Sequence, residues 1–258
     1  MNQSKTRQHL NTVLFDLDDT LIDWSGQEVE WADFTRPMMG NIYDYLAADG
    51  HALPGRDEFY NHIIEEIQNG WEEAKLTWSG LFFDRILSRA YARCHLDVAR
   101  IDVEATMRVY DWQPVPGVVP YPETRRVLDQ LRDRGLKLGL LTNSMFPMWM
   151  RDIELETYGL LPYFPARVSA GDTGDLKPNP AIYHHLLDKL GTTPETAIFV
   201  GDRPENDIAG ANATGLTSVL LSPPHLERAL DGVQPDFIIT TLNELLPIIE
   251  KMNKLPQT

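Results

Sequence analysis

Short apolar runs alternate with amphipathic stretches over most of this 258-residue chain. Such runs, bounded by turn residues, are typical of buried strands, and the stretches between them repeat apolar residues at helical spacing. This alternation predicts a mostly parallel sheet with helices on both faces. The expected strands lie at 12–22, 137–142, 167–170, 197–201, 218–221 and 237–240, and the expected helices between them at 123–134, 148–158, 180–190 and 207–214.

The strand pattern is interrupted between about Trp24 and Trp112, where helical periodicity takes its place. Apolar residues at three-to-four-residue spacing predict amphipathic helices there, and Asp49-Gly50 and Asn69-Gly70 have the composition of helix ends. Four prolines between Gln113 and Pro122 then exclude a continuing helix and predict an extended connector. The helices expected in this region lie at 27–48 (with a break or kink at Pro37), 56–68, 81–94 and 103–110.

We therefore expect an α/β protein built in two parts, preceded by an N-terminal tail at residues 1–11. Residues 12–22 and 115–250 would form the parallel-sheet core, and residues 23–114 an all-helical cap inserted after the first strand. A chain of this length suits one large domain or two modest ones, and it is long enough to bury a sizeable core.

Candidate functional side chains stand at the points where three of the expected strands end. The first strand runs into Asp16 and Asp18, the second ends in Thr142 and Asn143, and the fourth is followed by Asp202. Ligands of open α/β sheets bind outside the carboxyl ends of the strands. We therefore expect these side chains to meet at one edge of the sheet.

Lys177 and Asp207 add a cation and a further carboxylate to this set. Taken alone, each feature has a structural explanation: Lys177 precedes a proline in a loop, and Asp207 stands where a helix N-terminus favours negative charge. Together, clustered carboxylates favour a bound cation, and Mg²⁺ prefers oxygen ligands. The spacing of Asp16 and Asp18 can also supply a nucleophile and a separate acid or base.

In this order, the Asp16-x-Asp18 pair, Thr142-Asn143, Lys177 and the carboxylates after the fourth strand resemble the haloacid dehalogenase-like hydrolase superfamily. The resemblance covers roughly residues 12 to 245. It implies a Rossmann-like core and a helical cap between the first and second motifs, as in the capped phosphatases of that superfamily.

The resemblance also implies a role for each residue. Asp16 would attack phosphorus and form an aspartyl-phosphate, and Asp18 would protonate the leaving alkoxide and then activate water. Lys177 would bridge Asp16 and the phosphate, offsetting charge in the transition state. Asp18 would bind Mg²⁺ through its backbone carbonyl. Asp207 would bind directly, bind through water, or support the residues that touch the ion. The implied metal ligands are Asp16, Asp18, Asp202 and Asp207, and the implied phosphate contacts are Thr142 and Asn143.

The resemblance therefore implies a Mg²⁺-dependent phosphatase that hydrolyses a small-molecule phosphate ester. Asp18 favours phosphoryl transfer, because the dehalogenases of the superfamily lack a carboxylate two residues after the nucleophile. A sugar phosphomutase stays open, as does a phosphonate hydrolase using Lys75 as a Schiff-base lysine. A non-catalytic module that binds phosphorylated ligands is disfavoured, since Asp16, Asp18 and Lys177 are all present.

Composition narrows the set of partners and the compartment. The net charge of −15 disfavours nucleic acids and anionic membranes. The polar N-terminus and the single cysteine, Cys94, predict a cytoplasmic protein without an intramolecular disulfide. We expect a monomer or a homodimer.

Five of the six tryptophans fall in the expected cap or its hinges. Packing between helices explains most of them. Trp71 or Trp78 could instead line a cap pocket for an aromatic or sugar group.

Overall fold

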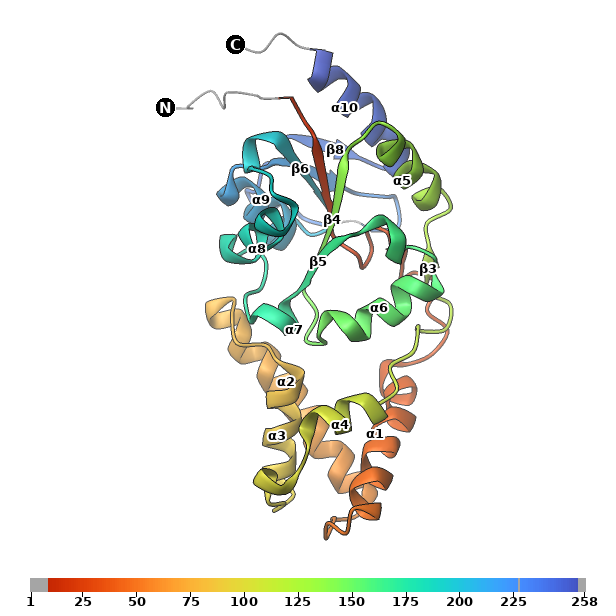
Figure 1. Cartoon of the computed structure of the whole chain (residues 1–258), viewed down its shortest axis with the longest axis vertical. Helices are drawn as coiled ribbons and strands as arrows, with labels where there is room; N and C mark the ends of the chain where they lie inside the picture. Colours follow the sequence, from red (N-terminus) through yellow and green to blue (C-terminus); the bar gives the residue numbers. More distant parts are fainter. Residues whose placement is uncertain (1–8, 227, 255–258) are drawn as a thin grey trace.

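The computed structural model describes residues 9–226 and 228–254, and Figure 1 shows a sheet-containing part above a helical part. The first eight residues of the expected tail lie outside the described residues. The residues that follow contact the core: Leu10 is buried, and the Asn11 N–H donates to the Thr196 carbonyl oxygen at 3.0 Å. None of the described helices is long and apolar enough to cross a bilayer.

A six-stranded parallel sheet forms the core and confirms the expected α/β class. The central strand β1 lies between β4 and β6, so the three strands that lead into the candidate residues are neighbours. The sheet order is β5-β4-β1-β6-β7-β8, with bounds Ala166–Ser169, Lys137–Thr142, Thr12–Phe15, Ala197–Gly201, Thr217–Leu221 and Phe237–Ile239.

Helices cover both faces of this sheet because successive strand residues point to opposite faces and are apolar on both. Val13 and Phe15 pack in the cluster that contains the buried residues of α5 and α10, whereas Leu14 packs in the one that contains those of α8 and α9. The core helices are α5 (Thr124–Asp133), α6 (Met148–Thr157), α7 (Ala170–Thr173), α8 (Pro180–Leu190), α9 (Ala209–Thr214) and α10 (Leu245–Lys254).

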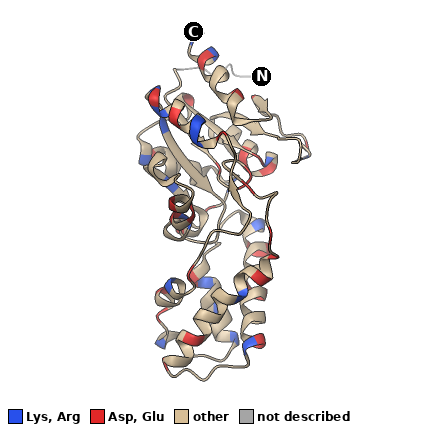
Figure 2. Ribbon diagram, turned by 90° about the vertical axis from the view of Figure 1, so that its right-hand side faces the viewer, with Lys and Arg blue, Asp and Glu red and all other residues tan. Residues whose placement is uncertain are grey.

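The lower part of Figure 1 is an all-helical insertion between the short antiparallel strands β2 (Ile22–Asp23) and β3 (Val119–Pro120). Acidic and basic residues are interspersed along its helices in Figure 2, and several of them form ion pairs, such as Arg93 with Glu65 and Glu66. Its helices are α1 (Trp31–Ala48), α2 (Arg56–Thr77), α3 (Phe83–Arg93) and α4 (Val103–Val109).

The expected first strand is too long, because β1 stops at Phe15. The chain turns at once: the Leu17 carbonyl oxygen accepts hydrogen bonds from the N–H groups of Thr20, Leu21 and Ile22. Asp19 takes a left-handed conformation within this turn, at φ 59°. This turn ends the strand hydrogen bonding of β1, so Asp18 does not continue along the direction of the strand.

The helix end expected at Asn69-Gly70 is wrong, because α2 continues to Thr77. Gly70 lies where α2 packs against α3, and a Cβ atom there would sit 3.2 Å from the Ile86 side chain. The glycine therefore serves close helix packing rather than termination. The expected break at Pro37 is also absent, since α1 runs through that residue.

Candidate active site

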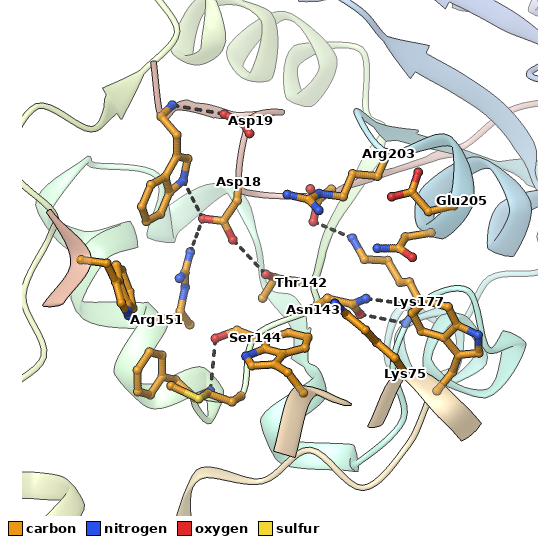
Figure 3. A pocket seen from close by; sticks show the side chains of 18 residues that line it. Asp18, Asp19, Lys75, Thr142, Asn143, Ser144, Arg151, Lys177, Arg203 and Glu205 are labelled. Atoms are coloured by element: carbon orange, nitrogen blue, oxygen red, sulfur yellow. Dashed lines mark hydrogen bonds and ion pairs between the residues drawn. The ribbon is translucent and has the colours of Figure 1, made fainter. Parts of the chain in front are cut away.

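The carboxyl ends of β1, β4 and β6 bring most of the candidate residues to one place, shown in Figure 3. Asp16 follows β1, Thr142 is the last residue of β4, and Asp202 follows Gly201 at the end of β6. The Asp16 N–H donates to the Val200 carbonyl oxygen at 2.9 Å, which carries the β1–β6 ladder one residue beyond the strand. The expectation that these residues share one edge is confirmed.

Lys177 is buried among the carboxylates, with Nζ 2.6 Å from Asp16 Oδ1 and 2.7 Å from Asp207 Oδ1. Burial alone would lower the pKa of the Lys177 ammonium, but Asp16 and Asp207 raise it above its usual value. The side chain of Asn143 holds the lysine backbone: its Nδ2 donates to the Lys177 carbonyl oxygen at 2.9 Å and its Oδ1 accepts from the Lys177 N–H at 2.7 Å. Lys177 is therefore a fixed positive charge.

Asp16, Asp202 and Asp207 form a buried acidic cluster in which one oxygen of each lies within 4.8 Å of the others. Burial raises the pKa of Asp16 to about 7 and that of Asp202 to about 8, and the neighbouring carboxylates add to both shifts. Both Asp202 oxygens are buried; Oδ2 pairs with the Arg228 guanidinium, and Oδ1 has no partner among the described residues. Clustered buried carboxylates with free oxygen valence fit a divalent cation of the Mg²⁺ type.

Asp207 differs from the other two acids because its oxygens are already engaged. Oδ1 faces Lys177, and Oδ2 accepts the Arg203 backbone N–H at 2.9 Å. Gly201 makes room for this arrangement, since a Cβ atom there would lie 2.4 Å from the Asp207 carboxylate. The arrangement favours a role for Asp207 in orienting Lys177.

The side chain of Asp18 lies outside the acidic cluster. Its Oδ1 accepts from Trp24 Nε1 at 3.0 Å and from an Arg151 Nη at 2.7 Å. Its Oδ2 accepts from Thr142 Oγ1 at 3.3 Å. The carboxylate is thus held from three directions at the end of β4, beside Asp16 in the chain but turned away from the other acids.

Arg151 was not predicted as a site residue, yet it is the buried contact that fixes Asp18. It comes from α6, and its Nε also lies 2.9 Å from Oε2 of the fully buried Glu154. Burial opposes the charged form, but Asp18 and Glu154 raise the pKa of Arg151. The sequence does carry a signal: Arg151 stands on the inward face of α6, between Met148 and Leu155.

Arg228 is a second residue that the sequence did not reveal. Its guanidinium pairs with Asp202 and lies 3.2 Å from Asp19 Oδ2. It reaches the site from the segment that follows β7, where no motif marks it. Its charge partly offsets that of the acidic cluster.

We expect Arg151→Met to lower kcat at least about tenfold, because Asp18 loses its strongest anchor. The variant should also lose about 3 kcal/mol of unfolding free energy, since Glu154 is left buried without its charged partner. Denaturant unfolding and steady-state kinetics measure the two effects. The double variant Arg151→Met/Glu154→Gln should recover most of the stability but not the rate; recovery of both would make Arg151 a structural residue alone.

The site opens into a cavity of about 730 Å³ between the core and the insertion. All the predicted catalytic and phosphate-contacting residues line it, including Asp16, Asp18, Thr142, Asn143 and Lys177. Its opposite wall comes from the insertion and carries the side chains Trp31, Trp71, Lys75 and Trp78. A ligand in this cavity would therefore touch both parts of the protein.

Comparison with known proteins identifies relatives of this chain. Residues 10–215 match the family model of haloacid dehalogenase-like hydrolases. The chain is 30% identical over 250 residues to the glyceraldehyde 3-phosphate phosphatase of Methanopyrus kandleri, across 95% of this chain and 99% of that protein. It is 34% identical over 225 residues to the phosphoserine phosphatase of Thermus thermophilus, across 81% and 88% of the two proteins.

Among solved structures, a 2-haloacid dehalogenase from Pseudomonas syringae shares the fold, with a TM-score of 0.62 over 94% of this chain and 99% of that one, at 23% identity. The chain therefore belongs to the haloacid dehalogenase-like hydrolase family. The two curated relatives described above, which match most of the chain, are phosphatases.

Proposed function

We propose that this protein is a Mg²⁺-dependent phosphatase that hydrolyses a small phosphorylated metabolite through an aspartyl-phosphate. The observation that carries the proposal is Asp16, a buried carboxylate set between the Lys177 ammonium and Asp202, whose Oδ1 has no partner among the described residues. A nucleophile flanked by a fixed cation and a metal site is what phosphoryl transfer requires. The relatives act on glyceraldehyde 3-phosphate and phosphoserine, which supports a small ester as substrate.

In the first step, an oxygen of Asp16 forms a bond to phosphorus while the bond from phosphorus to the ester oxygen breaks. Lys177 holds Asp16 and offsets the charge that develops on the phosphoryl oxygens. Asp16, Asp202 and the Asp18 backbone carbonyl would hold Mg²⁺, which when bound neutralises charge on the phosphate. The Thr142 hydroxyl and the Asn143 N–H would orient the remaining phosphoryl oxygens.

Asp18 would handle the proton in both halves of the reaction. It would donate a proton to the leaving alkoxide, and then take one from the water that hydrolyses the aspartyl-phosphate. Its contacts with Trp24, Arg151 and Thr142 keep the carboxylate at one position during this exchange. The presence of this second carboxylate favours phosphatase chemistry over dehalogenation.

Turnover of 4-nitrophenyl phosphate tests the proposal. Purified protein should hydrolyse it with Mg²⁺, and excess EDTA should lower the rate at least about 100-fold, because the phosphate then loses its neutralising cation. Dialysis into Mg²⁺ should restore the rate, which controls for denaturation by the chelator. Undiminished turnover in EDTA would refute the metal assignment, and no turnover of any phosphate ester would refute the proposed activity.

A further inference from the structure

One face of α2 is directed at the active-site cavity. Trp71 and Lys75 stand four residues apart, which places them on the same side of α2, and Trp78 follows directly after Thr77, the last residue of the helix. All three line the cavity opposite the carboxylates, and both indoles are partly exposed. Leu76, next to Lys75 in the chain, points away and is 84% exposed. The cavity therefore meets this face specifically.

Trp78 is held at a fixed position relative to the catalytic groups. It takes a left-handed conformation, φ 52° and ψ 42°, which is uncommon for a bulky residue and is often found at ligand sites. Its carbonyl oxygen accepts the Leu176 N–H at 2.9 Å, and the Gly80 N–H donates to the Gly174 carbonyl oxygen at 2.6 Å. Leu176 precedes Lys177, so the backbone of Trp78 is tied to the loop that carries Lys177.

Further aromatic side chains continue the apolar wall. Trp24 and Trp31 lie with ring centroids 6.2 Å apart, and Phe146 also lines the cavity. Flat faces on several sides of a cavity this size suit a flat occupant, because stacking and edge contacts require parallel or perpendicular rings. The phosphate-binding groups lie on the core side, which leaves the aromatic wall for the rest of the substrate.

Lys75 adds one positive charge to that wall. It forms no ion pair with any described residue. By contrast, four arginines of the insertion, outside the cavity lining, pair with acidic side chains; these are Arg36, Arg56, Arg89 and Arg93. Lys75 is thus the described basic side chain that the insertion offers to a ligand in the cavity.

We propose that the leaving group of the substrate is a planar ring that carries an anionic substituent such as a carboxylate. The ring lies against Trp71 and Trp78, and Lys75 contacts the anion. This inference rests on the proposed phosphatase function, which places the phosphate at Asp16 and so directs the leaving group toward α2. It assigns the specificity of the enzyme to one face of one helix.

Three alkyl phosphates test the contribution of the ring and that of the anionic substituent separately. They are ethyl phosphate, benzyl phosphate and 4-carboxybenzyl phosphate. All three release an alkoxide, so differences in kcat/KM reflect recognition of the leaving group more than its chemical reactivity. We expect wild-type kcat/KM to rise at least about tenfold from ethyl to benzyl phosphate and about fivefold more with the carboxylate.

Single substitutions test which residue causes each increase in kcat/KM. Trp71→Leu and Trp78→Leu should each lower kcat/KM about tenfold for benzyl phosphate but less than about threefold for ethyl phosphate. Trp78→Phe keeps an aromatic ring, so its kcat/KM for benzyl phosphate should be close to that of the wild type. Lys75→Met should abolish the preference for 4-carboxybenzyl over benzyl phosphate. Trp149→Leu, which removes a 38% exposed indole outside the cavity lining, and Leu76→Ala are the matched controls and should change neither ratio.

Binding separates failure of this inference from failure of the proposed activity. With Mg²⁺ present, 4-carboxybenzylphosphonate should bind at least about tenfold more tightly than ethylphosphonate in calorimetry, and Trp78→Leu should remove most of that difference. Equal binding of the two phosphonates, or variants that weaken all ligands alike, would overturn the inference even if phosphate esters are hydrolysed. Selective binding without turnover would support it and refute the phosphatase proposal instead.

Discussion

Asp16→Asn is expected to lower kcat by about 10⁴-fold or more, because the amide cannot attack phosphorus and no aspartyl-phosphate can form. The substitution is nearly isosteric. It also removes one of three buried carboxylates that face the charges of Lys177 and Arg228. The melting temperature without Mg²⁺ should therefore be no lower than that of the wild type. Steady-state kinetics and thermal unfolding measure the two expectations.

The exposed Asp188 on α8 offers a matched control, since Asp188→Asn makes the same chemical change far from the site. It should leave both kcat and the melting temperature unchanged. Turnover by Asp16→Asn within about tenfold of wild type would mean that another group is the nucleophile.

Lys177→Met is expected to lower kcat about 10³-fold, because the charge that offsets the transition state is removed from between Asp16 and Asp207. Lys177→Arg should not restore the rate, since the larger guanidinium does not fit a position buried to 2% exposure. The Met variant should lose about 3 kcal/mol of unfolding free energy without Mg²⁺, since the carboxylates are left unpaired.

A second variant separates catalysis from stability at this position. Lys177→Met/Asp207→Asn removes one unpaired acid, so it should recover much of the stability and none of the rate. Lys189→Met, at an exposed lysine on α8, is the control for loss of a lysine side chain. A fully active Lys177→Met enzyme would show that metal binding alone neutralises the phosphate.

The sequence predicted the sheet well because its strands are short apolar runs with sharp ends. The limits of β4 and β6 agree with the expected ones, and so do those of α8, where Asn179 caps the helix by accepting the Ala181 N–H at 3.0 Å. The α2 helix was cut short because Gly70 looks like a terminator in sequence, whereas its role depends on contact with Ile86 of α3. That contact cannot be read from local composition.

In the site, too, some residues could be predicted from local sequence and others could not. Residues that follow strands were predicted to meet, because a parallel sheet brings strand ends together whatever the loops do. Arg151 and Arg228 were missed, because each enters the site from an element whose orientation is set by packing with distant parts of the chain. The conformation of Trp78, and with it the direction of the α2 face, likewise follows from hydrogen bonds to residues almost a hundred positions away.

The hydrogen bonds that join residues 78–80 to residues 174–176 have a thermodynamic consequence. If the insertion swings away from the core, these bonds must break or the loop that carries Lys177 must move with it. Docking of the insertion and placement of the lysine are then linked equilibria. A phosphoryl group binds more tightly when Lys177 is in place. By thermodynamic reciprocity, binding of the phosphoryl group then strengthens docking of the insertion by the same factor by which docking strengthens binding of the phosphoryl group. An empty site and a loosely docked insertion would accompany each other without any separate latch.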